Sequence, residues 1–267
     1  MRRSVLTLTV VAAAGLLLAG CGSSTTPAAS ASKPSAPGSS STSLSGTVNV
    51  FAAASLKEAF TRLGQRFEAA HPGARVVFSF GPSSGLAAQI NQGAPADVFA
   101  SASAKNMDQV VAAGTASAPM DFAGNVMEIA VPARNPAGIT AFSDLAGSGV
   151  KVALCQPVVP CGTTAAKVLS NARLIVIPVT QEIDVKAVLT KVTLGEVDAG
   201  IVYVTDVRAA GAKVKGIEIP TELNASTTYP IATLTSAPNK ATAKAFTDYV
   251  LSSDGAGVLT AAGFARP

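Results

Sequence analysis

Residues 47–101 read TVNVFAAASLKEAFTRLGQRFEAAHPGARVVFSFGPSSGLAAQINQGAPADVFAS, and this stretch decides the fold class. Three short runs rich in β-branched and aromatic residues, at 47–51, 75–80 and 97–101, predict strands. Between the first two, apolar residues recur at intervals of three and four from Leu56, which predicts a helix that His71-Pro72-Gly73 ends. A shorter helix is predicted at 85–91. Strands that alternate with helices are typical of a parallel sheet with helices packed on it.

The alternation continues through the rest of the chain. Residues 199–204 (AGIVYV) are wholly apolar, which is typical of a strand buried on both faces. We therefore predict an α/β protein with two doubly wound lobes. The remaining predicted strands are 126–131, 150–154, 175–178, 217–219 and 231–234, and the remaining predicted helices are 164–170, 185–194, 241–251 and 256–262.

The N-terminus predicts export and a lipid anchor. Arg2 and Arg3 precede an apolar run at 10–19, which is short for a membrane span and typical of a signal peptide. The run ends in Leu18-Ala19-Gly20-Cys21, which resembles the lipobox of a bacterial lipoprotein. We predict removal of residues 1–20 and lipidation of Cys21, which would hold the protein on the outer side of the cell membrane. An ordinary signal peptide with an incidental cysteine is the alternative.

Residues 21–45 predict a flexible tether between the lipidated cysteine and the folded part. After Cys21 the segment is almost entirely Ser, Thr, Ala, Pro and Gly, with Leu44 as its only large apolar residue. Such a segment buries too little apolar surface to offset the entropy lost on ordering. About 220 residues then remain for the folded part, which is enough for two lobes.

Charge and cysteine content restrict the partners. The formal net charge of +4 includes Arg2 and Arg3, so the mature chain is near +2. Lys and Arg do not cluster and aromatic residues are few, so nucleic acid is not an expected partner. Cys155 and Cys161 are predicted to form a disulfide, because the compartment is oxidising. A metal site is the alternative, but the chain's single histidine leaves too few ligands.

Three turns between a strand and a helix carry polar donors, and exposed N–H groups at helix N-termini attract anions. Ser55 opens the first turn, where Ser55-Leu56-Lys57-Glu58 fits a capping box. The second turn, 81–85, reads GPSSG and matches the G-x-S-x-G nucleophile turn of hydrolases. A hydrolase needs a histidine base after the serine, whereas the only histidine, His71, precedes Ser83. The third turn, 157–164, is stiffened by two prolines.

Four blocks of the sequence resemble the molybdate-binding proteins of ABC importers. They are FAAASL at 51–56, SSGLAAQI at 83–90, GAPADVFASAS at 93–103 and GIVY at 200–203. The resemblance implies a type II periplasmic-binding-protein fold, with the ligand in a cleft between two lobes that a two-strand hinge joins. Lobe one would comprise 46–123 plus 231–267, and lobe two 124–230. It further implies a monomer that is not an enzyme, needs no cofactor, binds molybdate or tungstate and delivers it to a membrane permease.

The resemblance also implies which residues bind the oxyanion. Ser55 and Ser83 would donate through hydroxyl and backbone N–H groups, Cys161 and Val185 through backbone N–H groups, and Tyr203 through its phenol. The chain departs from the family at Cys161, where a small residue such as alanine is usual. A cleft that offers only donors would favour a fully deprotonated dianion over hydrogen phosphate, whose O–H would lack an acceptor. Sulfate is the alternative ligand, and hydrolysis through Ser83 is the alternative function.

Overall fold

The computed structural model describes residues 44–267. The predicted signal peptide (1–20), the lipidation site Cys21 and the tether up to residue 43 lie outside the described residues. Among residues 44–267, no helix combines the length and apolar character that crossing a membrane requires. The strands form one mixed sheet in the order β2-β1-β3-β9-β4-β7-β5-β6, with β8 paired to β4.

The first group of strands is built from the stretch that opens the folded part. In it β1 lies between β2 and β3 and runs parallel to both, and β3 pairs antiparallel with β9. Helix α1 turns Phe60, Leu63 and Phe67 into the core, as their spacing predicts. The elements of this group are β1 (Ser45–Ala53), η1 (Ala54–Leu56), α1 (Lys57–Ala70), β2 (Gly73–Gly81), α2 (Ser83–Asn91), β3 (Val98–Ala100), α3 (Ala104–Ala112), α7 (Lys240–Leu251) and α8 (Ser253–Ala262).

The second group of strands follows the same principle. Strand β5 runs parallel to β6 and β7, and β7 pairs antiparallel with β4. All five residues of β7 are buried, as the apolar run predicted. The elements of this group are η2 (Phe142–Ala146), β5 (Val152–Cys155), α4 (Pro160–Asn171), β6 (Thr180–Glu182), α5 (Val185–Thr193), β7 (Ala199–Tyr203), α6 (Val204–Ala210), η3 (Gly211–Lys213) and β8 (Val214–Glu218).

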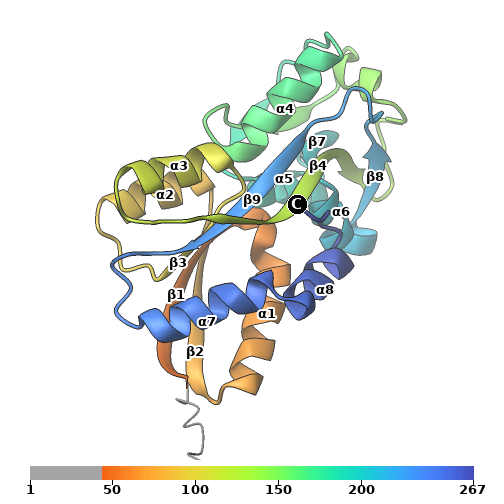
Figure 1. Cartoon of the computed structure of the whole chain (residues 1–267). Helices are drawn as coiled ribbons and strands as arrows, with labels where there is room; N and C mark the ends of the chain where they lie inside the picture. Colours follow the sequence, from red (N-terminus) through yellow and green to blue (C-terminus); the bar gives the residue numbers. More distant parts are fainter. Residues whose placement is uncertain (1–43) are drawn as a thin grey trace, which may run out of the picture. The chain divides into compact units, whose positions relative to one another are not determined.

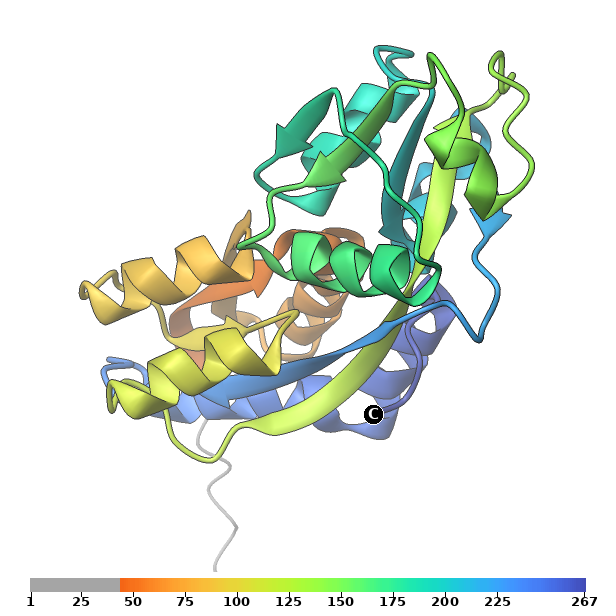
Figure 2. The same ribbon diagram turned by 90° about the horizontal axis from the view of Figure 1, so that it is seen from above.

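Two long strands connect the groups, namely β4 (Met120–Pro132) and β9 (Ser226–Thr233). They pair with each other antiparallel and run side by side through the centre of Figure 1 and Figure 2. The far half of β4 then pairs with β7 and β8, while the end of β9 pairs with β3. The buried residues of the second group form a cluster of their own, distinct from two clusters in the first group.

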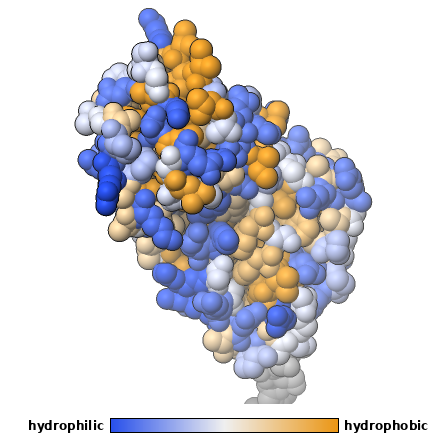
Figure 3. Space-filling model, turned by 180° about the vertical axis from the view of Figure 1, so that it is seen from behind, coloured by the Kyte–Doolittle hydropathy of each residue, from blue (hydrophilic) through white to orange (hydrophobic). Residues whose placement is uncertain are grey.

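The predicted strand at 175–178 is wrong. Residues 174–178 are irregular, and the strand that pairs with β5 begins only at Thr180. The side chains of Ile175 and Ile177 are 83% and 84% exposed, because no layer covers them, and Pro178 lacks a backbone donor for the ladder. Among residues 44–267, six of the nine large exposed hydrophobic residues lie at positions 158–194. On one face of the molecule, hydrophobic residues gather at the upper end (Figure 3).

Other boundaries differ because tertiary pairing extends or ends an element. Strands β4 and β9 are longer than predicted, since their polar halves pair with each other. Helix α6 begins directly after Tyr203, so the strand predicted for 199–204 ends one residue early. Helix α3 was not predicted.

Candidate functional site

A small cavity lies where several strands end and the following helices begin. Its volume is about 20 Å³, which suits a solute of few atoms, since one water molecule already needs ~10–15 Å³. It is the meeting point of segments that are far apart in the sequence and come from both groups of strands. The lining residues are Ala53, Ala54, Ser55, Gly81, Pro82, Ser83, Ala102, Val159, Pro160, Cys161, Asp184, Val185 and Tyr203. All five residues predicted to bind the oxyanion are among them.

Three helices begin at this cavity. Ser83 is the first residue of α2, Cys161 the second residue of α4, and Val185 the first residue of α5. Backbone N–H groups in the first turn of a helix have no partner within the helix, and they carry its positive partial charge. Neither α2 nor α4 has a side chain that caps its N-terminus. The three N-termini therefore present donors and positive potential to one small volume.

The Ser83 hydroxyl is arranged to donate into the cavity. The side chain is buried, and its Oγ accepts a hydrogen bond of 2.9 Å from the backbone N–H of Ala102. A hydroxyl has one proton and two acceptor sites. Since the contact with Ala102 occupies an acceptor site, the Ser83 proton remains available for a bound acceptor.

The capping box predicted at Ser55 does not form. Ser55 lies inside η1, and α1 begins two residues later with Leu56 as an N-cap that lacks a side-chain hydrogen bond. The Ser55 Oγ instead lies 2.9 Å from the hydroxyl of Tyr229, which belongs to β9. Tyr229, a partner that only tertiary folding provides, has replaced the predicted local hydrogen bond to the helix backbone.

Tyr203 contributes a buried phenol at the end of β7. The side chain is only 1% exposed, and its hydroxyl has no hydrogen-bond partner among the described residues. Burial raises the pKa of Tyr203 well above its ordinary value, so the phenol keeps its proton and can donate. An unpartnered buried hydroxyl is costly, which suggests that a ligand completes it.

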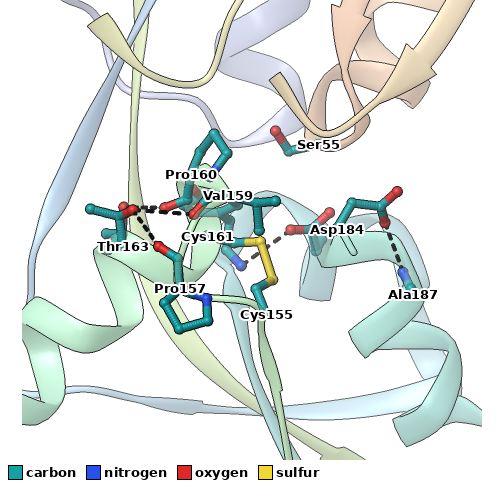
Figure 4. Close-up of a disulfide and its surroundings, with 12 residues drawn as sticks. Ser55, Cys155, Pro157, Val159, Pro160, Cys161, Thr163, Asp184 and Ala187 are labelled. Atoms are coloured by element: carbon teal, nitrogen blue, oxygen red, sulfur yellow. Dashed lines mark hydrogen bonds between the residues drawn. A yellow bond between two sulfur atoms is a disulfide. The ribbon is translucent and has the colours of Figure 1, made fainter. Parts of the chain in front are cut away.

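The predicted disulfide between Cys155 and Cys161 is present, with a Cα–Cα separation of 5.8 Å. It joins the end of β5 to the first turn of α4, and Ser55 lies on a separate element facing this region (Figure 4). The Thr163 hydroxyl donates to the carbonyl of Pro157 and further fixes the turn. A Cβ at Gly162 would lie 1.9 Å from the carbonyl oxygen of Gln156, so the turn has no room for a side chain there.

One charged side chain lines the cavity. Asp184 is the only charged residue among the described residues that line it, and its Oδ1 caps α5 by accepting from the N–H of Ala187. Lys186, the second residue of α5, does not line the cavity, and its Nζ lies 2.7 Å from Glu58 and 3.0 Å from Asp206. Burial raises the pKa of Asp206 to about 6, although Lys186 opposes the shift.

This arrangement favours binding over catalysis. The cavity holds several hydroxyl and backbone donors, but its lining contains no histidine. His71 instead caps the C-terminal end of α1, and its ring is tilted against that of Phe67 with a centroid separation of 4.6 Å. Residues 44–267 contain no group of three or more His, Cys, Asp or Glu side chains that could hold a metal ion. The one carboxylate in the lining, Asp184, accepts from the helix that it caps, and the hydroxyl and backbone donors suit a small anion.

Comparison with known proteins agrees with this geometry. Residues 48–265 match the family described as bacterial extracellular solute-binding proteins. The chain belongs to this family. It is 41% identical over 251 residues to the molybdate-binding protein ModA of Mycobacterium tuberculosis, a match that covers 94% of this chain and 93% of the relative. Membership in a family of solute-binding proteins confirms the prediction that the chain is not an enzyme.

Solved structures confirm the predicted periplasmic-binding-protein fold. The periplasmic molybdate-binding protein of Azotobacter vinelandii superposes with a TM-score of 0.74 at 23% identity, covering 82% of this chain and 99% of that one. The substrate-binding domain of a putative molybdenum ABC transporter from Clostridium difficile gives a TM-score of 0.63 at 28% identity, covering 83% and 99%. The two-strand hinge and the lobe boundaries stay predictions.

Sequence reasoning missed the residues behind the cavity. Tyr229 and Asn125 are buried and connect to Ser55, but neither belongs to a recognisable local motif. Tyr229 lies 174 residues from Ser55 in the chain. A conserved pattern across homologues would have been the only signal available before folding.

Proposed function

We propose that this protein binds molybdate, and also tungstate, outside the cytoplasmic membrane and delivers it to the permease of an ABC importer. The observation that carries the proposal is the convergence of Ser55, Ser83, Cys161, Val185 and Tyr203 on one cavity. The relative from M. tuberculosis is named a molybdate-binding protein, which supports the same ligand here. No cofactor is required for this role.

The donor set accounts for the choice of ligand. Burying a dianion is unfavourable unless its oxygens are hydrogen-bonded. Hydroxyls of Ser55, Ser83 and Tyr203, with backbone N–H groups at the starts of α4 and α5, would satisfy a tetrahedral oxyanion without any Lys or Arg contact. An anion that kept a proton would direct an O–H at donors, so a fully deprotonated ion is preferred.

Approach of the anion is assisted by a larger groove beside the cavity. This groove of about 1120 Å³ shares Pro160 with the cavity, and Lys105 and Lys167 line it. Positive side chains in a concave surface raise the local concentration of anions. They attract the anion without contacting it in the final site.

We further propose the division into lobes 46–123 plus 231–267 and 124–230, with β4 and β9 as the hinge. Donors from both groups of strands line the cavity, so a bound anion would favour closure, as such folds use hinge motion around a ligand. The closed form would dock on the permease as a monomer. Lipidation of Cys21, with the tether to residue 45, would keep it near the membrane.

The test is calorimetric titration of the full chain, purified in detergent, with molybdate, tungstate, sulfate and phosphate in separate runs. Binding of one molybdate or one tungstate per chain, with no heat from sulfate or phosphate, is the expected result. Sulfate binding instead would retain the solute-binding role and overturn the ligand. No binding at all would contradict the proposal, and a serine-reactive fluorophosphonate would then test the hydrolase alternative at Ser83.

Membrane attachment is tested separately. Cells grown with labelled palmitate should transfer label to the wild-type chain and not to Cys21→Ser, and the variant should be released from the membrane fraction. Equal retention of both proteins in the membrane would contradict the anchor.

A further inference from the structure

A buried chain of hydrogen bonds lies behind Ser55. Asn125 Nδ2 lies 2.8 Å from Thr205 Oγ1 and 3.4 Å from the Tyr229 hydroxyl, and that hydroxyl lies 2.9 Å from Ser55 Oγ. All four residues are at least 95% buried. They come from β4, α6, β9 and η1 respectively, so no local segment could assemble them.

The orientation of the Asn125 amide is determined by the backbone. Asn125 Oδ1 accepts a hydrogen bond of 3.0 Å from the N–H of Val126. If the amide were reversed, its NH₂ group would face this N–H donor, which is unfavourable. The NH₂ group of Asn125 therefore faces Thr205 and Tyr229 as a donor.

This orientation determines where the Tyr229 proton goes. The NH₂ group of Asn125 cannot accept a hydrogen bond, so the Tyr229 hydroxyl can only receive from it. The one other hydrogen-bond partner of that hydroxyl among the described residues is Ser55 Oγ. Tyr229 therefore donates to Ser55. Burial also raises the pKa of Tyr229, which keeps the phenol protonated.

The Ser55 hydroxyl can then donate its own proton only to a partner other than Tyr229. Its oxygen accepts from Tyr229, so the proton is directed away from Tyr229. Ser55 lines the cavity with the other predicted donors. Without Tyr229 the hydroxyl could rotate, and its oxygen could equally accept a proton from a protonated ligand.

We propose that Tyr229 and Asn125 are positioning residues that hold the Ser55 hydroxyl as an obligate donor to the bound oxyanion. The inference rests on the proposed function, since it concerns the selection of fully deprotonated anions in that site. Neither side chain lines the cavity, so both act through Ser55.

The test is a double-mutant cycle between Tyr229→Phe and Ser55→Ala, read as molybdate affinity of the full chain by calorimetry. Tyr229→Phe should weaken binding about tenfold in the wild-type background, because the Ser55 hydroxyl would no longer be held in position to donate its charge-assisted hydrogen bond to the anion. In the Ser55→Ala background, the same change should alter affinity less than about twofold, because the hydroxyl through which Tyr229 acts on the ligand has been removed. Tyr249→Phe, which removes the hydroxyl of a half-buried tyrosine in α7 that does not line the cavity, is the matched control and should bind like wild type.

An equal loss in both backgrounds would show that Tyr229 supports the fold and not the Ser55 proton, and would overturn the inference. Wild-type affinity in Tyr229→Phe would also overturn it. Failure of the wild-type chain to bind any oxyanion would refute the proposed function, and the inference with it. If Tyr229→Phe does not fold, Asn125→Ala takes its place, because it removes the NH₂ donor that directs the Tyr229 proton to Ser55 and adds no charge near the anion. Its loss of affinity should again be smaller in the Ser55→Ala background.

Discussion

The phenol of Tyr203 gives the most informative perturbation, because its role in binding and its effect on folding should have opposite signs. The side chain is 1% exposed, and its hydroxyl has no partner among the described residues. A buried hydroxyl without a partner costs ~1–3 kcal/mol relative to its hydrated state. Phenylalanine preserves the ring and removes the unpaired group. We therefore expect Tyr203→Phe to raise the free energy of unfolding of the ligand-free protein by about 1 kcal/mol.

The same change should weaken binding. A hydrogen bond to a charged group contributes ~1.5–3 kcal/mol, which corresponds to a loss of affinity of roughly 10- to 150-fold. Urea unfolding without ligand measures the first effect, and calorimetry with molybdate measures the second. Tyr249→Phe is the control, since Tyr249 is a half-buried residue of α7 that does not line the cavity.

Two results would refute this reasoning. If Tyr203→Phe binds molybdate like wild type, the phenol does not contact the anion. If the variant loses more than about 1 kcal/mol of stability without ligand, the hydroxyl has a structural partner that compensates its burial.

Three further variants test other parts of the site. Ser83→Ala should weaken molybdate binding by ~1–3 kcal/mol, as calorimetry would measure. It should also lower the free energy of unfolding by ~1 kcal/mol in urea, because the N–H of Ala102 loses its acceptor. An unchanged affinity would show that Ser83 is not part of the site. Burial raises the pKa of Asp206 from 3.8 to about 6. Between these two pH values the folded state binds more protons than the unfolded state, so the free energy of unfolding falls as pH rises, by at most ~3 kcal/mol. Urea unfolding at pH 4 and pH 6.5 should show this fall in wild type and lose it in Asp206→Asn; an equal pH dependence in both would exclude Asp206 as its source. Gly162→Ala should abolish tight anion binding or folding of the turn, since the new Cβ would meet the carbonyl of Gln156. A fully stable variant that binds normally in calorimetry would show that the turn has room for a side chain.

Local patterns in the sequence determined the elements and their order. The apolar spacing of α1 and the apolar run of β7 involve residues a few positions apart, and the structure confirms both elements. The disulfide between Cys155 and Cys161 was also predictable, because the exported chain lies in an oxidising compartment and these two cysteines remain after Cys21. The motifs around Ser55 and Ser83 indicated where strands end and donors gather. These features follow from short-range chemistry that the chain carries before it folds.

Tertiary structure decided what those patterns left open. The β-branched run at 175–178 resembles a strand, but the folded sheet provides no layer to cover Ile175 and Ile177. Ser55 has the sequence of a helix cap, yet Tyr229 binds it instead from 174 residues away. Within each group, parallel strands bring their carboxyl ends to one edge. The donors of the two groups meet in one cavity only because the folded chain brings these two edges together. Hydrogen-bond direction and burial depend on neighbours in space, and a sequence specifies those neighbours only through the completed fold.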